Sequence, residues 1–153
     1  MAAPPHNLRP PLESEFEALY ALHFAAMGDY VIATWGPWIE EIQREFFAVR
    51  MTSGNLRVIE VGSEVAGLLE VEEREEAMFL SNIQLAPEFQ GRCLGTKIIA
   101  ALQADTASRA RPLDLTVLRV NPAKHLYDRL GFLETQMTVT HHHMRWTPPP
   151  PYS

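Results

Sequence analysis

The chain has 153 residues, of which 46% are hydrophobic and 21% are charged, and its formal net charge at pH 7 is −6. This length suits one domain with one hydrophobic core, and the acidic balance offers no basic field to a phosphate backbone, so we expect no nucleic-acid partner. No apolar run comes near the roughly 20 residues that a membrane-spanning helix needs, so we expect no membrane partner either.

Both ends of the chain are rich in proline, which lacks the N–H group that a helix interior or a sheet ladder requires. We therefore expect a flexible N-terminal segment over residues 1–11, a single domain over residues 12–146 and a disordered tail over residues 147–153. The first residues lack the cationic and apolar regions of a secretory signal, and Cys93 is the only cysteine. These features favour a cytoplasmic location.

Two amphipathic helices are predicted in the first third of the chain. Ser14 and Glu17 have the spacing of a capping box, and apolar residues then recur at helical intervals as far as Met27. Pro37 suits the first position of a second helix, whose apolar residues continue to Val49 before a Thr-Ser-Gly-Asn run ends the pattern.

The middle and the end of the chain predict a mixed sheet. Three antiparallel strands are expected over residues 56–61, 65–71 and 77–85. The later elements are a helix over residues 94–109, a strand over 113–120, a short helix over 123–130 and closing strands over 132–139 and 141–146. The central strand–helix–strand crossover must be right-handed and joins parallel strands. This order predicts an α+β fold, a mixed central sheet with helices on both faces.

A strand, a glycine-containing turn and a helix start follow one another between Ile83 and Lys97. Unpaired amides in the first turn of a helix, together with the positive end of its dipole, bind anions without any net positive charge on the protein. Arg92 and Lys97 add charge nearby. Because Gly91 and Gly95 fit neither GxGxxG nor GxxxxGK[ST], two common nucleotide-binding patterns are disfavoured.

These residues resemble the GNAT superfamily of N-acetyltransferases, whose coenzyme loop reads [Q/R]xxGx[G/A] after a strand. Gln90, Cys93 and Gly95 match that pattern, with Cys93 in place of the first loop glycine. The runs LAPEFQG and VNPAKHLYDRLGF extend the resemblance over residues 55–132, and TWGPWIEEIQREFF and THHHMRW are similar to an uncharacterised bacterial subgroup. The resemblance implies the sandwich-like acyl-CoA N-acyltransferase fold, with acetyl-CoA as cosubstrate and no metal.

The same resemblance implies which residues bind the coenzyme. The strand before the loop pairs with the pantetheine arm, the loop holds the pyrophosphate, and Asn121 touches the pantetheine amides. The implied coenzyme-binding residues are Ile83, Gln84, Leu85, Gln90, Gly91, Arg92, Cys93, Leu94, Gly95, Thr96, Asn121 and Tyr127. The alternatives are an ordinary sheet ladder, a simple turn before a helix, and a helix cap at Asn121.

Cys93 is the one departure from the family loop. Glycine tolerates any backbone angle, whereas cysteine tolerates the ordinary ones and adds bulk near the pyrophosphate. We expect the residue to be helical and the substitution to be mild, with weaker coenzyme binding as the alternative. As a covalent nucleophile Cys93 is disfavoured, because no His or Asp partner is evident.

Two residues are predicted to act in catalysis. By resemblance, Tyr127 lies beside the coenzyme sulfur, where a phenol protonates the departing thiolate or stabilises its charge. Its alternative is a core tyrosine. Glu70, a carboxylate in an apolar run, is the candidate general base, with a solvent-facing position as its alternative. Ser81 and Asn82 rank below it, as groups that hold a water or orient the acceptor.

Aromatic and histidine residues offer two further candidate sites. Tyr30, Trp35 and Trp38 are expected in the core, with the floor of an acceptor pocket as their alternative. His141, His142 and His143 are not expected to bind a metal, because strand alternation leaves two of them on one face without an acidic partner.

The expected function is direct transfer of an acetyl group from acetyl-CoA to a primary amine of a small molecule or peptide in a ternary complex. The alternatives are a non-catalytic acyl-CoA-binding module and an interaction domain with a decayed loop. The closing strands also allow a homodimer to form by pairing across a two-fold axis.

Overall fold

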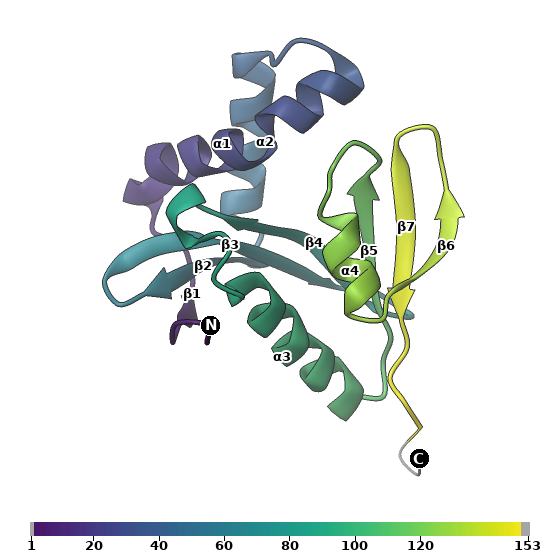
Figure 1. Cartoon of the computed structure of the whole chain (residues 1–153). Helices are drawn as coiled ribbons and strands as arrows, with labels where there is room; N and C mark the ends of the chain where they lie inside the picture. The colour runs from purple at the N-terminus through teal and green to yellow at the C-terminus, as the bar shows by residue number, and fades with distance from the viewer. Residues whose placement is uncertain (1, 151–153) are drawn as a thin grey trace. The chain divides into compact units, whose positions relative to one another are not determined.

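In the computed structural model of the protein, residues 2–150 are described. They form two compact units, whose helices and strands are labelled in Figure 1. The first contains the described residues up to Glu70 together with Asn82–Leu94, and the second contains Val71–Ser81 together with the described residues from Gly95 onward. Among these residues no helix combines the length and apolar character needed to cross a membrane.

Seven strands form one mixed sheet in the order β1, β2, β3, β4, β5, β7, β6. Their bounds are β1 (Asn7–Arg9), β2 (Leu56–Val61), β3 (Glu64–Glu73), β4 (Met78–Leu85), β5 (Leu113–Leu118), β6 (Leu133–Met137) and β7 (His141–Trp146). β2 is antiparallel to β1 and β3, β4 is parallel to β5, and β7 is antiparallel to β5 and β6. The sheet confirms the predicted α+β class and the parallel crossover.

The helices fall where the sequence predicted helices, with different ends. Their bounds are α1 (Phe16–Trp35), α2 (Glu40–Met51), α3 (Leu94–Ser108) and α4 (Lys124–Arg129), with short 3-10 turns η1 (Glu13–Glu15) and η2 (Pro87–Phe89). The capping box predicted at Ser14 and Glu17 is wrong, although α1 begins at Phe16, the first apolar residue of the predicted pattern. Ser14 lies within η1, and Glu15 precedes α1 but uses its carboxylate to accept the Leu12 N–H at 2.8 Å and to bind Arg9. The ion pair with Arg9 thus replaces the expected capping box.

The link between α1 and α2 is also different from the prediction. Pro37 precedes the helix start at Glu40 instead of opening the helix. The cause is Trp38, whose indole Nε1 donates to the Tyr20 hydroxyl at 2.9 Å and whose ring meets Phe24 edge-on at 4.9 Å. These contacts turn the chain back onto α1 before α2 begins.

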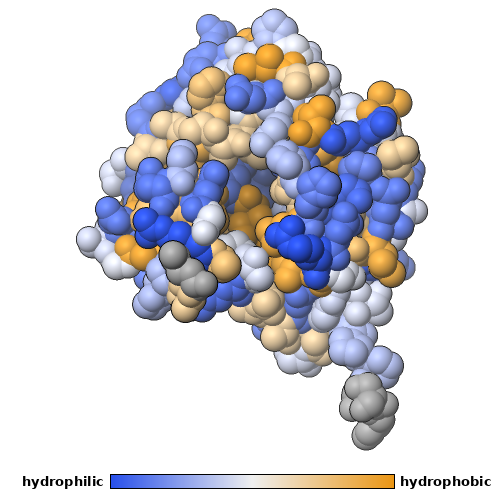
Figure 2. All heavy atoms as spheres, in the orientation of Figure 1, coloured by the Kyte–Doolittle hydropathy of each residue, from blue (hydrophilic) through white to orange (hydrophobic). Residues whose placement is uncertain are grey.

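The core of the first unit lies between the two helices and the strands β2 and β3. Its buried members are Leu19, Tyr20, Phe47, Leu56, Val58 and Leu68. The surface of the two helices is partly apolar, because Phe24 and Ile32 of α1 and Phe46 and Val49 of α2 are exposed. Orange and pale orange atoms mark this part of the molecule in Figure 2.

The second unit is centred on β5, which pairs with β4 on one side and β7 on the other. Leu113, Leu115 and Met144 are buried in these strands. The amide of Gln103 on α3 donates to the Leu130 carbonyl at 2.9 Å and so ties α3 to the end of α4. Strand β6 forms the exposed edge of the sheet.

The N-terminal segment holds a strand that the sequence did not predict. Asn7–Arg9 pairs with β2, and the Arg9 guanidinium binds Glu60 of β2 at 2.9 Å. Prolines on both sides of this three-residue strand hid it, because its pattern is too short to read. At the other end, residues 147–150 have no regular secondary structure, and residues 151–153 of the predicted tail lie outside the described residues.

Candidate active site

Side chains at the end of β4 point alternately to the two faces of the sheet, as in any strand. Asn82 and Gln84 form side-chain hydrogen bonds with each other, at 3.2 Å, and with groups of β3 and α1. Ile83 and Leu85, the predicted partners of the pantetheine arm, lie on the other face. Each strand face therefore has its own chemistry, polar on one side and apolar on the other.

Close strand approach at this point depends on Gly67 of β3. A Cβ atom at Gly67 would lie 2.1 Å from the Gln84 carbonyl oxygen, far inside van der Waals contact. The next hydrogen bond along, from the Ala86 N–H to the Ala66 carbonyl at 2.8 Å, carries the chain out of the sheet and into the turn. A residue without a side chain is thus required for the strand to reach its final position.

Within the second unit, β4 and β5 part soon after they meet. Their parallel register covers Met78–Leu80 and Leu113–Leu115, and Ser81 and Thr116, the next residues along, are no longer paired. Ser81 Oγ is buried there and has no hydrogen-bond partner among the described residues. Within the second unit the ladder between these two strands is therefore three residue pairs long.

The turn after β4 is held by its own residues. The Phe89 side chain is buried, and the Gln90 amide donates back to the Leu85 carbonyl at 3.0 Å. Gly91 has φ +73° and Cys93 has φ +62°. The expectation that Cys93 is helical is wrong, while its effect on coenzyme binding stays a prediction. Cys93 adopts the left-handed region that favours glycine, and the strain costs roughly 1–2 kcal/mol.

The start of α3 presents unengaged backbone donors. Among the described residues, no backbone hydrogen bond outside the helices and strands uses an N–H from Gly91 to Thr96. The first N–H groups of a helix also have no partner within it. Leu94 is buried, with 1% of its surface exposed, and so anchors the helix start. The role of this segment as an anion site stays a prediction.

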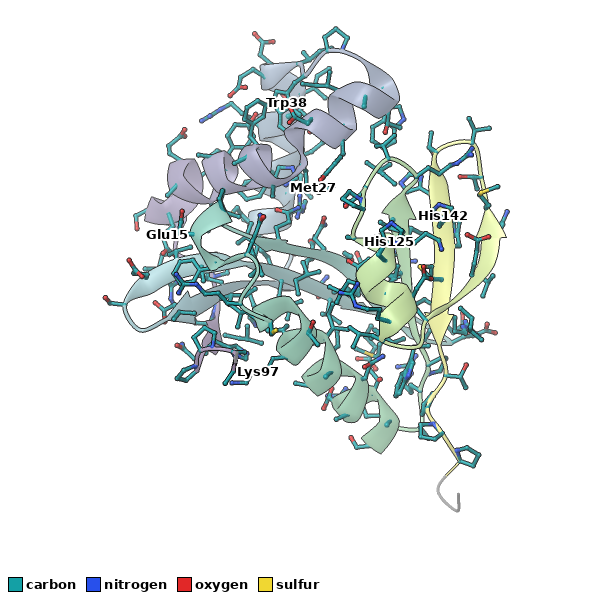
Figure 3. The ribbon with its side chains drawn as sticks, in the orientation of Figure 1. Glu15, Met27, Trp38, Lys97, His125 and His142 are labelled. Carbon is teal, nitrogen blue, oxygen red and sulfur yellow. The ribbon has the colours of Figure 1, made fainter. Side chains whose placement is uncertain are left out.

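Two cationic residues lie in this segment or directly after it. The Arg92 guanidinium lies 5.4 Å from the centre of the Phe89 ring, which supports it by a cation–π contact. Lys97 is exposed in the first turn of α3 (Figure 3). Neither residue forms an ion pair within the described part of the chain. Both charges therefore remain available to an anionic ligand.

Tyr127 lies on α4 in the second unit and is buried, with 8% of its surface exposed. Its ring meets Phe132 edge-on at 5.8 Å, and its hydroxyl makes no hydrogen bond to another described residue. Burial raises the pKa of Tyr127 to about 12, so the phenol stays protonated at neutral pH. A protonated phenol is a hydrogen-bond donor, which the predicted role at the sulfur needs.

Asn121 stabilises the turn before α4. Its side-chain oxygen accepts the Ala123 N–H at 2.9 Å, across Pro122, and so shapes the turn that leads into α4. The bond does not cap the helix itself, because the N-cap residue of α4 is Ala123 and has no side-chain cap bond. The Asn121 side-chain nitrogen has no hydrogen-bond partner among the described residues. A contact with pantetheine amides remains a prediction.

Glu70 lies on β3 in the first unit, with 6% of its surface exposed, so the solvent-facing alternative is wrong. Its Oε1 accepts hydrogen bonds from Arg50 Nε at 3.0 Å and from Asn82 Nδ2 at 2.9 Å. Neither bond falls on Oε2. The carboxylate is thus fixed in place with one oxygen still available.

His23 and Arg50 were not singled out as site residues from the sequence, and the structure connects both to this group. His23 Nδ1 lies 3.1 Å from Gln84 Oε1, and Arg50 pairs with Glu70. The available signal was a lone polar residue on each apolar helix face. Periodicity alone assigns such a residue to the core pattern, which is what hid His23.

The aromatic residues weighed as an acceptor floor do not form one group. Trp38, labelled in Figure 3, packs among Tyr20, His23 and Phe24. Trp35 is 60% exposed, so the expectation that it lies in the core is wrong. Of the histidines, His142 is bonded to Glu134, and the pKa of His141 is lowered by burial and by its neighbour His143. Across residues 2–150 no group of three or more His, Cys, Asp or Glu side chains is placed to hold a metal ion.

Comparison with known proteins agrees with this geometry. A family model described as an acetyltransferase (GNAT) domain matches residues 26–148. No curated protein sequence matches the chain significantly.

Solved structures share the fold at low sequence identity. An acetyltransferase from Thermus thermophilus is 18% identical with a TM-score of 0.76, over 96% of this chain and 99% of that one. The PaiA N-acetyltransferase from Thermoplasma acidophilum, in complex with coenzyme A, is 15% identical with a TM-score of 0.70, over 94% and 99%. The ribosomal-protein-S18-alanine N-acetyltransferase from Escherichia coli is 18% identical with a TM-score of 0.69, over 97% of both chains. The family model spans most of the chain and the fold agrees with it, so the chain belongs to the acetyltransferase (GNAT) domain family and is an acetyl-CoA-dependent acyltransferase.

Proposed function

We propose that this protein transfers an acetyl group from acetyl-CoA to a primary amine by direct attack in a ternary complex. The unengaged N–H groups between Gly91 and Thr96 carry this proposal, because they offer a pyrophosphate a set of donors at a helix start. Arg92 and Lys97, free of ion pairs in the described chain, add positive charge. The complex of the similar PaiA acetyltransferase with coenzyme A supports the choice of coenzyme.

Tyr127 is proposed to stabilise the departing thiolate. The pKa of its phenol is about 12, whereas a thiol has a pKa near 8.5, so full proton transfer to the sulfur is uphill by roughly 5 kcal/mol. A hydrogen bond to the developing charge has no such cost. We therefore propose that Tyr127 donates a hydrogen bond to the sulfur, and that the thiolate takes its proton later from solvent.

Glu70 is proposed to take the proton that the attacking ammonium must lose, either directly or through one water. Its free Oε2 supports this role, because the bonds from Arg50 and Asn82 both fall on Oε1 and hold the carboxylate in one orientation. Asn82 and Ser81 are proposed to orient the acceptor or its water.

The acceptor is proposed to be a cationic amine of a small molecule or a peptide, and an acidic protein of net charge −6 suits such a partner. Polyamines, aminoglycosides, amino-acid derivatives and peptide N-termini belong to this class. A cytoplasmic location and a homodimer paired through the closing strands are part of the same proposal.

Two measurements test the proposal. Calorimetry with acetyl-CoA measures binding, and a thiol-release assay over a panel of those four amine classes measures transfer. We expect binding together with amine-dependent thiol release. Tight binding without thiol release would favour a non-catalytic acyl-CoA-binding module, and the absence of binding to any CoA species would remove the proposal altogether.

A further inference from the structure

Five polar side chains form one hydrogen-bond chain within the first unit. Arg50 Nε and Asn82 Nδ2 both reach Glu70 Oε1, Gln84 Nε2 reaches Asn82 Oδ1 at 3.2 Å, and His23 Nδ1 reaches Gln84 Oε1 at 3.1 Å. Glu70, Gln84 and His23 are buried, with 6%, 3% and 9% of their surfaces exposed. This hydrogen-bond chain runs from α2 through β3 and β4 to α1.

The charge of Glu70 fixes the direction of every bond in this chain. A carboxylate paired with arginine accepts hydrogen bonds and donates none, so Asn82 must present its NH2 group to Glu70. The Asn82 oxygen then faces Gln84, which must donate with its own NH2 group. The Gln84 oxygen is left to face His23, whose Nδ1 must therefore carry a proton.

This direction determines the tautomer of His23. A neutral imidazole with its proton on Nδ1 has a lone pair on Nε2. Burial, followed by the nearby positive charge of Arg50, lowers the pKa of His23 to about 4, while the bond to Gln84 opposes this shift. The ring is therefore neutral at physiological pH, and Nε2 is a hydrogen-bond acceptor.

The acceptor atom Nε2 is not fully enclosed, although His23 as a whole is buried with 9% of its surface exposed. No hydrogen bond from a described residue reaches His23 Nε2, and this atom is not among the buried unpaired atoms of the described chain. The ring itself is held by Phe47, stacked at 5.4 Å, and by Trp38 at 5.8 Å. A fixed ring, a fixed tautomer and an accessible lone pair are what a specific N–H recognition site requires.

We propose that His23 Nε2 accepts a hydrogen bond from the acceptor amine, and that Gln84, Asn82, Glu70 and Arg50 act as positioning residues that set its tautomer. The inference rests on the proposed function for the identity of the bound amine. It limits the acceptor to amines that carry an N–H donor when they bind. His23 orients the amine and does not deprotonate it, since its pKa of about 4 makes it a much weaker base than an alkylamine.

The location fits this role. Gln84 lies between Ile83 and Leu85 on β4, whose backbone groups are proposed to take the thioester arm. His23 contacts the polar face of that same strand. Glu70 keeps Oε2 for the proton while Oε1 stays an acceptor in either protonation state, so the direction of the chain survives the proton transfer.

Nitrogen-15 NMR of histidine-labelled protein, without coenzyme, tests the tautomer and the binding together. We expect the His23 spectrum to show a protonated Nδ1 and an unprotonated Nε2. Adding n-butylammonium should shift the Nε2 resonance, whereas trimethyl(butyl)ammonium, which has the charge but no N–H, should leave it unchanged. The opposite tautomer, or equal shifts with both cations, would overturn the proposal.

Matched variants test the positioning residues. Asn82→Leu interrupts the hydrogen-bond chain, so the Gln84 side-chain amide can rotate by 180° and both His23 tautomers should appear. Asn7→Leu is the control, because Asn7 also donates to a glutamate, Glu60 at 3.0 Å, but lies outside the hydrogen-bond chain. A pure Nδ1–H tautomer in Asn82→Leu would show that the direction is not set from Glu70.

Two replacements of His23 separate its two nitrogens. In His23→Asn the amide reaches the position of Nδ1 and loses Nε2, and in His23→Gln it reaches the position of Nε2. We expect n-butylammonium to bind about tenfold more weakly to His23→Asn and nearly unchanged to His23→Gln. Equal weakening in both variants would indicate a structural role and overturn the proposal.

These results are independent of the transfer assay. If thiol release occurs but n-butylammonium leaves Nε2 unshifted, the inference fails and the proposed function stands. If the shift occurs in a protein that releases no thiol, the amine site stands and the proposed function fails.

Discussion

Replacing Cys93 with glycine should stabilise the protein. Cys93 has φ +62°, and a non-glycine residue in this region costs roughly 1–2 kcal/mol. Glycine removes that strain but adds freedom to the unfolded chain, which offsets roughly 0.5–1 kcal/mol. Because Cys93 is exposed, little packing is lost. The net gain should be about 1 kcal/mol, or a rise in Tm of about 2–4 °C for a chain of this size.

Scanning calorimetry of the protein without coenzyme measures this change. Cys93→Ser is the matched control, because it keeps the Cβ atom and the strain, so its Tm should stay near that of the unchanged protein. Gly91→Ala is the converse, since Gly91 has φ +73° and a Cβ there meets no atom within 4 Å. Its loss of about 1 kcal/mol would be purely conformational. If Cys93→Ser were as stabilising as Cys93→Gly, the thiol and not the backbone would be responsible, and the reasoning would be refuted.

Three more outcomes are expected. Gly67→Ala should cost about 3 kcal/mol or more in urea denaturation, because its Cβ would meet the Gln84 carbonyl oxygen at 2.1 Å, and a loss below about 1 kcal/mol would contradict the close approach. Tyr127→Phe should lower kcat about 100-fold at unchanged acetyl-CoA affinity, measured by thiol release and calorimetry, and unchanged turnover would remove Tyr127 from the mechanism. Stability should fall as the pH drops from 6.5 to 4, because the folded-state pKa of His23 is about 4 against 6.5 unfolded, so the unfolded chain binds more protons in this window. The loss in the free energy of unfolding should reach about 3 kcal/mol, and urea titrations at pH 7 and pH 4.5 measure it. His23→Gln should lose less stability than the unchanged protein over this range, and an equal loss would contradict this assignment.

The sequence alone determined the elements that have a strong local signal. Strands β2 and β7 have the predicted bounds, and α3 begins at the predicted Leu94, because period and turn residues mark them within a few positions. The family resemblance is confirmed for the same reason, since the motif around Gln90 and Gly95 is local in the chain.

Backbone angles and polar pairings were decided by the tertiary structure. The left-handed angle at Cys93 depends on how the turn joins a buried Leu94 to a strand end, and no residue pattern reports it. The tautomer of His23 depends on Glu70, which lies 47 positions away in the sequence and is connected to it through two amides of β4. A hydrogen bond needs its donor and acceptor within about 3 Å, and residues distant in sequence reach that separation only after the chain has folded.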